Sequence, residues 1–248
     1  TLVIDSKTGE IIKQQYSLQQ KFPASLTKLM TLYLTFEAIE NKKFDHDQKL
    51  FISANAANQP ASKIGLKSGD YITVMEAIMA LIIKSANDAA VVLAENIAGN
   101  ERSFSYLMNH KALQLRMYDT RFRNSSGLHD INQYTTARDM AKLVLGIKNH
   151  YPQYFPLFSK INFRYKNRRY YTHNHMVSEY NMVNGIKTGY TKASGYNLIT
   201  SARNDDIEVI AILLGEKSAI KRDNKMKKLI SEIFFNQRLK RITSLAIN

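Results

Sequence analysis

Three short polar motifs contain the residue types of a serine-based catalytic site. They are Ser25-Leu26-Thr27-Lys28, Ser85-Ala86-Asn87 and Lys187-Thr188-Gly189. A serine hydroxyl becomes a strong nucleophile when a nearby base takes its proton, and a lysine can be that base once its amine is neutral. Ser25 and Lys28 are three positions apart, so they share one face of a helix. Together the motifs predict an active serine that requires neither histidine nor metal.

Lys28 is the residue that we interpret as the base. Burial disfavours the charged form of a lysine, and so does a second positive charge nearby. We expect Lys187 to supply that charge from the third motif. Both effects would favour a neutral Lys28 that can take the Ser25 proton.

Each motif also occurs a second time, and we interpret the second copies as coincidences. They are Ser218-Ala219-Ile220-Lys221, Ser53-Ala54-Asn55 and Lys7-Thr8-Gly9. Lys7-Thr8-Gly9 falls in a predicted hairpin turn, and no partner motif follows Ser218. The first set alone combines a helix start, a turn between helices and a strand in that order.

Hydrophobic periodicity predicts the elements that must position these motifs. Sheet is expected at both ends of the chain, as a hairpin around Asp5-Ser6-Lys7-Thr8-Gly9 and as antiparallel strands over 196–202 and 207–214. Helices are expected over residues 25–39, 73–82, 88–98, 135–147 and 221–235.

The motifs fall at particular points of these elements. Ser25 lies in the first turn of a helix, the Ser85 motif connects two helices, and Lys187 lies on a strand beside the C-terminal pair. Thr73 and Glu76 have the spacing of a capping box. We therefore predict the α/β fold class, with an antiparallel sheet flanked by helices and an inserted all-helical subdomain.

Composition narrows the classes of function. The 248 residues are 44% hydrophobic, enough for a sizeable core, and the lack of cysteine excludes disulfides and thiol nucleophiles. The longest mostly apolar run, residues 77–83, is far shorter than the roughly 20 residues that cross a bilayer. The net charge of +14 favours anionic partners, but no nucleic-acid motif is present and nucleic-acid binding is not expected.

Histidine chemistry is the alternative to a lysine base. His173 and His175 alternate without a neighbouring carboxylate or third ligand, so neither a metal nor another cofactor is expected. His129-Asp130 could form part of a Ser-His-Asp triad, yet no glycine-flanked serine accompanies it. The lysine mechanism therefore remains favoured.

Five segments carry a resemblance to a known family over nearly the whole chain. The chain resembles the D-alanyl-D-alanine carboxypeptidases, the low-molecular-mass penicillin-binding proteins of the S11 serine peptidase family, which implies a β-lactamase/transpeptidase-like fold. The segments are Phe22-Pro23-Ala24-Ser25-Leu26-Thr27-Lys28-Leu29-Met30-Thr31, Lys84-Ser85-Ala86-Asn87-Asp88-Ala89-Ala90, Gly127-Leu128-His129-Asp130, Tyr134-Thr135-Thr136-Ala137-Arg138-Asp139-Met140 and Gly185-Ile186-Lys187-Thr188-Gly189-Tyr190-Thr191.

The resemblance implies a catalytic role for five residues. Ser25 would attack the carbonyl between two terminal D-alanines and form an acyl-enzyme, while Lys28 takes the hydroxyl proton. Ser85 would pass a proton toward the leaving amine, and Asn87 would hydrogen-bond the substrate or steady Lys28. Lys187 would supply positive charge beside the two serines.

The resemblance also implies how the substrate binds. Thr188 and Arg222 would hold its terminal carboxylate, and the backbone N–H groups of Ser25 and Tyr190 would form an oxyanion hole. The substrate would add as a strand along the third motif. The strand residues in contact with it would be Thr188, Gly189, Tyr190 and Thr191.

The implied partners are peptidoglycan stem peptides that end in D-Ala-D-Ala, with β-lactams as covalent inhibitors. The expected location is the periplasm or the outer face of the cytoplasmic membrane, after export by a signal peptide that is not in this chain. We interpret residues 1–248 as one catalytic domain, with a sheet subdomain from both termini, a helical subdomain from the middle and no C-terminal β-domain. Peripheral membrane association would use a segment outside this chain.

Departures from the family pattern and neighbouring activities leave alternatives open. Asn184 stands where relatives commonly have Asp, and His173 where a basic residue is common, which affects substrate preference.

A DD-endopeptidase that cuts crosslinks uses the same catalytic set. A β-lactamase shares the acylation residues, but the neighbourhood of Glu179-Tyr180-Asn181 lacks the Glu-x-x-Leu-Asn pattern for fast deacylation. A catalytically silent wall-binding module is the alternative from another class.

Overall fold

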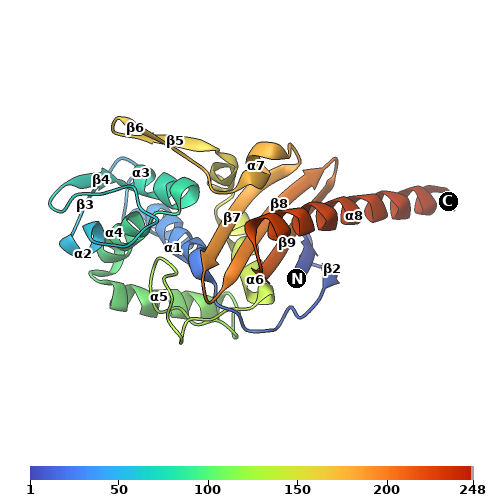
Figure 1. The fold of residues 1–248 in the computed structure, drawn as a ribbon, viewed down its shortest axis with the longest axis horizontal. Helices are drawn as coiled ribbons and strands as arrows, with labels where there is room; N and C mark the ends of the chain where they lie inside the picture. Colours follow the sequence, from blue (N-terminus) through green and yellow to red (C-terminus); the bar gives the residue numbers. More distant parts are fainter. Residues whose placement is uncertain (247–248) are drawn as a thin grey trace.

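A five-stranded antiparallel sheet organises this computed structural model, which describes residues 1–246 (Figure 1). The strand order is β2-β1-β9-β8-β7, and all neighbours are antiparallel. The strands are β1 (Leu2–Asp5), β2 (Ile11–Gln14), β7 (Val183–Thr191), β8 (Gly195–Asn204) and β9 (Ile207–Glu216). The predicted antiparallel sheet from both ends of the chain is thus confirmed, and β7 forms one of its edges.

Alternate side chains of the sheet enter two separate cores. Leu2 faces the larger core, which contains α1 (Lys28–Glu40) and α6 (Ala137–His150). Val3, the next residue, faces the smaller core under α8 (Ala219–Ala246). In Figure 1, α8 crosses one face of the sheet and projects beyond it. Strand β9 is an almost continuous apolar run because both of its faces are buried.

Helix α1 is the centre of the molecule and is buried around nearly its whole circumference. A helix in that position must be apolar on every side, which explains why its sequence shows little amphipathic contrast. The helices of the middle of the chain are α2 (Ala54–Ala57), α3 (Val74–Met79), α4 (Asn87–Ala98) and α5 (Glu101–Gln114). Helices α4 and α5 contact α1, and α2 and α3 contact α4. The middle of the chain is thus mainly helical, as predicted.

Helix boundaries differ from the prediction where the motifs lie. Ser25 belongs to a short 3-10 helix, Ala24–Thr27, that leads into α1. The predicted capping box is confirmed at the start of α3, but that helix continues as a π-helical segment, Ala80–Lys84. Asn87 is the first residue of α4 and does not lie in the preceding turn. A π-helical turn inside a helix is frequently found at a functional site.

Several short elements were not predicted. Two hairpins pair β3 (Lys49–Phe51) with β4 (Tyr71–Thr73), and β5 (Asn162–Tyr165) with β6 (Arg168–Tyr171). Other short elements that were not predicted are α2, α7 (His175–Glu179) and a 3-10 helix, Phe155–Ser159. The 14-residue helix α5 was not predicted either. Strands of three or four residues carry too little alternation to be distinguished from loops.

None of the helices within residues 1–246 has the length and apolar character of a membrane span. The division into two subdomains stays a prediction.

Candidate active site

The Ser25 backbone is held by contacts on two sides. Asn197, buried on β8, donates from Nδ2 to the carbonyl oxygens of the two residues before Ala24, at 3.1 Å each. On the other side, a Cβ at Gly127 would lie 1.9 Å from Ala24 O, and the φ of Gly127 is +84°. Only glycine fits that position. These contacts hold Ser25 half-buried at the start of α1, on the wall of a cleft.

Lys28 is fully buried, and its amine contacts three oxygen atoms. Nζ lies 3.2 Å from Ser25 Oγ and 2.8 Å from Asn87 Oδ1, and it also donates to the carbonyl of Ser126. The amide and carbonyl oxygens can only accept. A neutral amine has two N–H donors and one lone pair, so these two acceptors leave the lone pair for the Ser25 proton. The contacts therefore suit a base that lies beside its nucleophile.

The two buried lysines have lowered pKa values. Burial lowers the pKa of Lys28 well below its usual value, and the charge of Lys187 lowers it further, whereas Asp88 opposes this shift. Burial also lowers the pKa of Lys187 to about 7, with a smaller contribution from the Arg222 guanidinium. Both causes favour a neutral Lys28. Burial and the Lys187 charge are the two causes expected from the sequence.

Asp88 organises the loop that forms one wall of the cleft. Its buried carboxylate accepts hydrogen bonds of 2.9 to 3.3 Å from four backbone N–H groups, those of Ile64, Gly65, Leu66 and Ala89. Backbone N–H donors stabilise a buried carboxylate charge. Asn87 joins the same loop, because its Nδ2 donates to Pro60 O at 3.0 Å. The amide that contacts Lys28 is thereby fixed at both ends.

Ser85 ends the π-helical segment in a left-handed conformation, with a φ of +56°. Its hydroxyl oxygen is buried and has no hydrogen-bond partner within the part of the chain that the structure describes. Ser85 lines the same cleft as Ser25. Since buried hydroxyl groups nearly always have a partner, this one is available to a bound molecule.

The cleft has a volume of about 550 Å³ and brings most of the predicted site residues together. Those on its wall are Ser25, Ser85, Asn87, Thr188, Gly189, Tyr190, Thr191 and Arg222. Lys28 and Lys187 are buried behind this wall, at 0% and 2% exposed. Two hydroxyls, an amide and a strand therefore converge in front of two buried amines.

Strand β7 forms one side of the cleft, and as a sheet edge it has one unpaired side. Gly189 allows β7 to approach the 3-10 helix closely. A Cβ at Gly189 would lie 3.1 Å from both Pro23 O and Ser25 N. This approach sets the backbone at Tyr190 next to the backbone of Ser25.

Arg222, on the cleft wall, and Lys187, buried behind it, already have partners. Arg222 lies in the first turn of α8, and its Nε and Nη2 bind the Asp223 carboxylate at 2.8 and 3.1 Å. Lys187 Nζ donates to Thr188 O at 3.1 Å. Within residues 1–246, Lys187 makes no hydrogen bond to either serine. Any effect of Lys187 on the serines is therefore electrostatic.

Two contacts of the site had no recognisable signal in the sequence. One is the Ser126 carbonyl on Lys28, and the other is the Asn197 amide that holds the chain before Ser25. The Ser126 loop is fixed by Glu101, which accepts from Ser125 Oγ at 2.6 Å. A backbone carbonyl leaves no trace in residue type, and the glycine turn at Gly127 was the nearest available sign.

Two of the three second copies of the motifs have a serine with a structural role. Ser53 accepts from Ala56 N at 3.0 Å as the cap of α2 and donates to Glu95 at 2.5 Å. Ser218 Oγ accepts from Lys221 N at 3.1 Å at the start of α8.

His173, which lines the cleft, has its Nε2 3.1 Å from Lys84 Nζ. Residues 1–246 hold no group of three His, Cys, Asp or Glu side chains placed for a metal ion.

Comparison with known proteins finds one family over most of the chain. The model of the D-alanyl-D-alanine carboxypeptidase family, peptidase S11, matches residues 1–218. The chain is 34% identical to the D-alanyl-D-alanine carboxypeptidase DacD of Escherichia coli K12 over 236 residues, which are 92% of this chain and 61% of the relative. Penicillin-binding protein 5 of Haemophilus influenzae has a similar structure, with a TM-score of 0.90 and 31% identity over 94% of this chain and 69% of that one.

A second solved structure is similar over nearly its whole length. Penicillin-binding protein D2 of Listeria monocytogenes, in its cefotaxime-bound form, has a TM-score of 0.84 at 28% identity and covers 93% of this chain and 94% of its own. These likenesses confirm the predicted fold. The chain spans 59 to 61% of the length of the first curated relatives that it matches. Because the family match includes all three motifs, the chain belongs to the D-alanyl-D-alanine carboxypeptidase family, peptidase S11.

Proposed function

We propose that this chain is the catalytic part of a serine-type DD-carboxypeptidase. It removes the terminal D-alanine from peptidoglycan stem peptides through an acyl-enzyme on Ser25, and β-lactams acylate the same residue. The observation that carries the proposal is the buried Lys28 amine, 3.2 Å from Ser25 Oγ, with its two N–H donors already bound elsewhere. Folding alone requires neither a buried lysine in that place nor an unpaired Ser85 hydroxyl.

Acylation begins when Lys28 Nζ takes the proton of Ser25 Oγ. The oxygen then forms a bond to the carbonyl carbon between the two D-alanines. The carbon–nitrogen bond breaks as a proton passes from Lys28 through the Ser85 hydroxyl to the leaving amine. Ser85 suits this relay because its hydroxyl lies in the same cleft and is unpaired within residues 1–246. Asn87 holds the Lys28 amine in place throughout.

The negative groups of the substrate, its oxyanion and its terminal carboxylate, are bound by hydrogen-bond donors and cationic side chains of the site. The backbone N–H groups of Ser25 and Tyr190 receive the negative oxygen of the tetrahedral intermediate, a stabilisation of about 3 to 4 kcal/mol per donor in other enzymes. Thr188 and Arg222 receive the terminal carboxylate, and Lys187 adds positive charge from behind the wall. Gly189 and Thr191 contribute backbone along the edge of β7, where the substrate adds as a strand.

Deacylation reuses the same groups. After D-alanine leaves, water attacks the ester carbon while Lys28 again takes a proton. The bond to Ser25 Oγ breaks, and that oxygen recovers its proton from Lys28. A β-lactam enters the first half of this cycle, because its ring amide replaces the peptide bond and its amine stays attached. The cefotaxime-bound form of the Listeria protein supports this proposal by analogy.

The proposed setting follows from the substrate. Stem peptides are assembled into the wall outside the cytoplasmic membrane, so we place the enzyme in the periplasm or on the outer face of that membrane. The charge of +14 suits a surface near anionic wall polymers or lipid headgroups. Peripheral membrane association would come from a segment outside this chain.

The direct test is release of D-alanine from a purified pentapeptide that ends in D-Ala-D-Ala. Wild-type protein should release one D-alanine per peptide, and a Ser25→Ala variant should release none. A crosslinked peptide dimer is the second substrate. Preferential cleavage of the dimer would favour an endopeptidase, and rapid hydrolysis of nitrocefin would favour a β-lactamase. A folded wild-type protein that leaves both peptides intact would overturn the proposal.

A further inference from the structure

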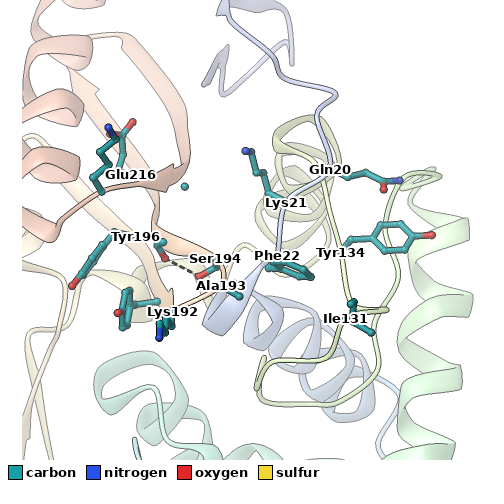
Figure 2. Close-up of a pocket in the computed structure, with 14 residues that line it drawn as sticks. Gln20, Lys21, Phe22, Ile131, Tyr134, Lys192, Ala193, Ser194, Tyr196 and Glu216 are labelled. Atoms are coloured by element: carbon teal, nitrogen blue, oxygen red, sulfur yellow. Dashed lines mark hydrogen bonds between the residues drawn. The ribbon is translucent and has the colours of Figure 1, made fainter.

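A second cavity opens directly beside the cleft, between the turn that joins β7 to β8 and the segment that contains Ile131 and Tyr134 (Figure 2). Its volume is about 760 Å³. Tyr190 and Tyr196 line both this cavity and the cleft, and their rings stack with centroids 4.3 Å apart. The two hollows are therefore adjacent at the end of β7 and share these two rings as a common wall.

This cavity, which we call the lysine pocket, has Lys21, Lys192 and Lys217 among its lining residues. None of these three lysines has an ion-pair partner among the residues that the structure describes. The pocket also contains the carboxylate of Glu216, but this group is paired with Lys225 at 2.6 Å. The lysine pocket thus presents unneutralised positive charge.

The opposite wall of the lysine pocket is apolar. Ile131 is 78% exposed, an unusual value for a large aliphatic side chain, and Phe22 and Tyr134 lie along the same wall (Figure 2). Such a wall suits a chain of methylene groups, while the lysines suit an anionic end. A ligand that matches the pocket therefore combines an aliphatic stretch with a carboxylate.

The proposed function fixes which part of a substrate reaches this pocket. Its terminal carboxylate lies toward Thr188, and its reacting carbonyl lies at Tyr190. A peptide with that direction runs antiparallel to β7, so its earlier residues pass Thr191 and meet the turn at Lys192. Each residue of an extended chain advances about 3.3 Å. The residue before the two D-alanines therefore lies at the mouth of the lysine pocket.

We propose that the lysine pocket binds the acyl part of the substrate and selects a carboxylate on the residue that precedes D-Ala-D-Ala. This inference rests on the proposed function, because it uses the direction in which that substrate lies. It adds a preference for an anionic acyl donor, which neither the three motifs nor the cleft requires. A neutral or cationic side chain at the same place would leave the lysines without a partner.

Three synthetic peptides test the preference. They are Nα-acetyl-X-D-Ala-D-Ala, in which X is L-glutamate, L-glutamine or L-lysine, so that only the end of one side chain changes. We expect kcat/KM for the glutamate peptide to exceed that for the glutamine peptide about three- to tenfold at low salt, with the lysine peptide the slowest. The ratio should fall toward one at about 1 M salt, where the screening length is about 3 Å.

Substitutions locate the preference. In Lys192→Ala combined with Lys217→Ala, the glutamate-to-glutamine ratio should fall below about twofold, whereas Lys192→Arg should keep it. Lys43→Ala combined with Lys49→Ala removes two exposed charges outside the pocket and serves as the matched control, with an unchanged ratio. Thermal unfolding and covalent labelling by penicillin check that each variant is folded and still acylates Ser25.

The outcomes separate this inference from the proposed function. Cleavage of all three peptides with equal kcat/KM would overturn the lysine pocket and leave the carboxypeptidase intact. Fastest cleavage of the lysine peptide would also overturn it and would assign the recognising group to Glu216. If folded wild-type protein cleaves none of the peptides, the proposed function fails and the subsite fails with it.

Discussion

Replacing Asn87 by aspartate should move the acylation of Ser25 to higher pH. The substituted side chain has nearly the same shape but places a carboxylate about where Asn87 Oδ1 now lies, 2.8 Å from Lys28 Nζ. An opposite charge at that distance favours the charged form of a lysine. Its pKa then rises by about 1 to 3 units. Lys28 must be neutral to take the serine proton, so the variant needs a correspondingly higher pH to react.

The size of the effect follows from the shift. In wild-type protein the acylation rate should rise with pH, about tenfold per unit, until Lys28 has lost its proton. In the Asn87→Asp variant the same rising limb should appear about 1 to 3 pH units higher. At any pH on the limb the variant then reacts about 10 to 1000 times more slowly. The assay is the second-order rate constant for labelling by a fluorescent penicillin between mildly acidic and alkaline pH.

The pH profile separates electrostatics from structural damage. Asn87 also donates to Pro60 O at 3.0 Å, and the aspartate loses that bond, with a penalty of about 1 to 3 kcal/mol. A structural loss of that kind lowers the rate equally at every pH. Asn96→Asp is the matched control, because it adds the same charge about 13 Å further along α4. A rising limb at the wild-type pH, or at lower pH, in Asn87→Asp would refute Lys28 as the base.

Four further predictions follow from the site. Lys28→Met should remove the base and lower penicillin labelling at least about 100-fold, while the circular dichroism spectrum stays native. Gly189→Ala should slow labelling of Ser25, because its Cβ would lie 3.1 Å from the Ser25 backbone nitrogen; an unchanged rate would contradict the close approach. Asp88→Asn should lower the free energy of unfolding by about 2 to 4 kcal/mol in urea, since four backbone N–H groups lose a charged acceptor. The pKa of Lys187 near 7 is below its unfolded value, so the folded state binds fewer protons and this group should make stability rise by up to about 1.4 kcal/mol per pH unit from pH 7 to 9. Lys28, whose pKa is also lowered, adds a slope of the same sign, so Lys187→Met should reduce the total slope by the Lys187 contribution and not abolish it.

The sequence predicted the parts of the fold that periodicity can encode. Strands β8 and β9 are long apolar runs separated by a polar turn, and the capping box marks the start of α3 without ambiguity. The short hairpins β3–β4 and β5–β6 were not predicted, because three or four residues do not establish an alternation of apolar and polar side chains. The π-helical segment was not predicted, because the change from i→i+4 to i→i+5 backbone hydrogen bonds is set by packing and leaves no separate pattern in the sequence.

The chemistry was predictable where it depends on residue type and spacing. Ser25 and Lys28 were found because a helical turn brings them together, and the structure places their side-chain atoms 3.2 Å apart. The Ser126 carbonyl, which completes the Lys28 environment, is a backbone group and could not be found in that way. The lysine pocket was also hidden, because Lys21, Lys192 and Lys217 come from distant segments that only the folded sheet brings to one end of β7.

The central claim is that the Ser25 hydroxyl is the nucleophile, and intact-protein mass spectrometry after incubation with a β-lactam tests it most directly. Wild-type protein should gain the mass of one β-lactam, and digestion should place the adduct on the peptide that contains Ser25. The Ser25→Ala variant should gain no mass. An adduct on Ser25→Ala, or an adduct on a different peptide of the wild-type protein, would contradict the account.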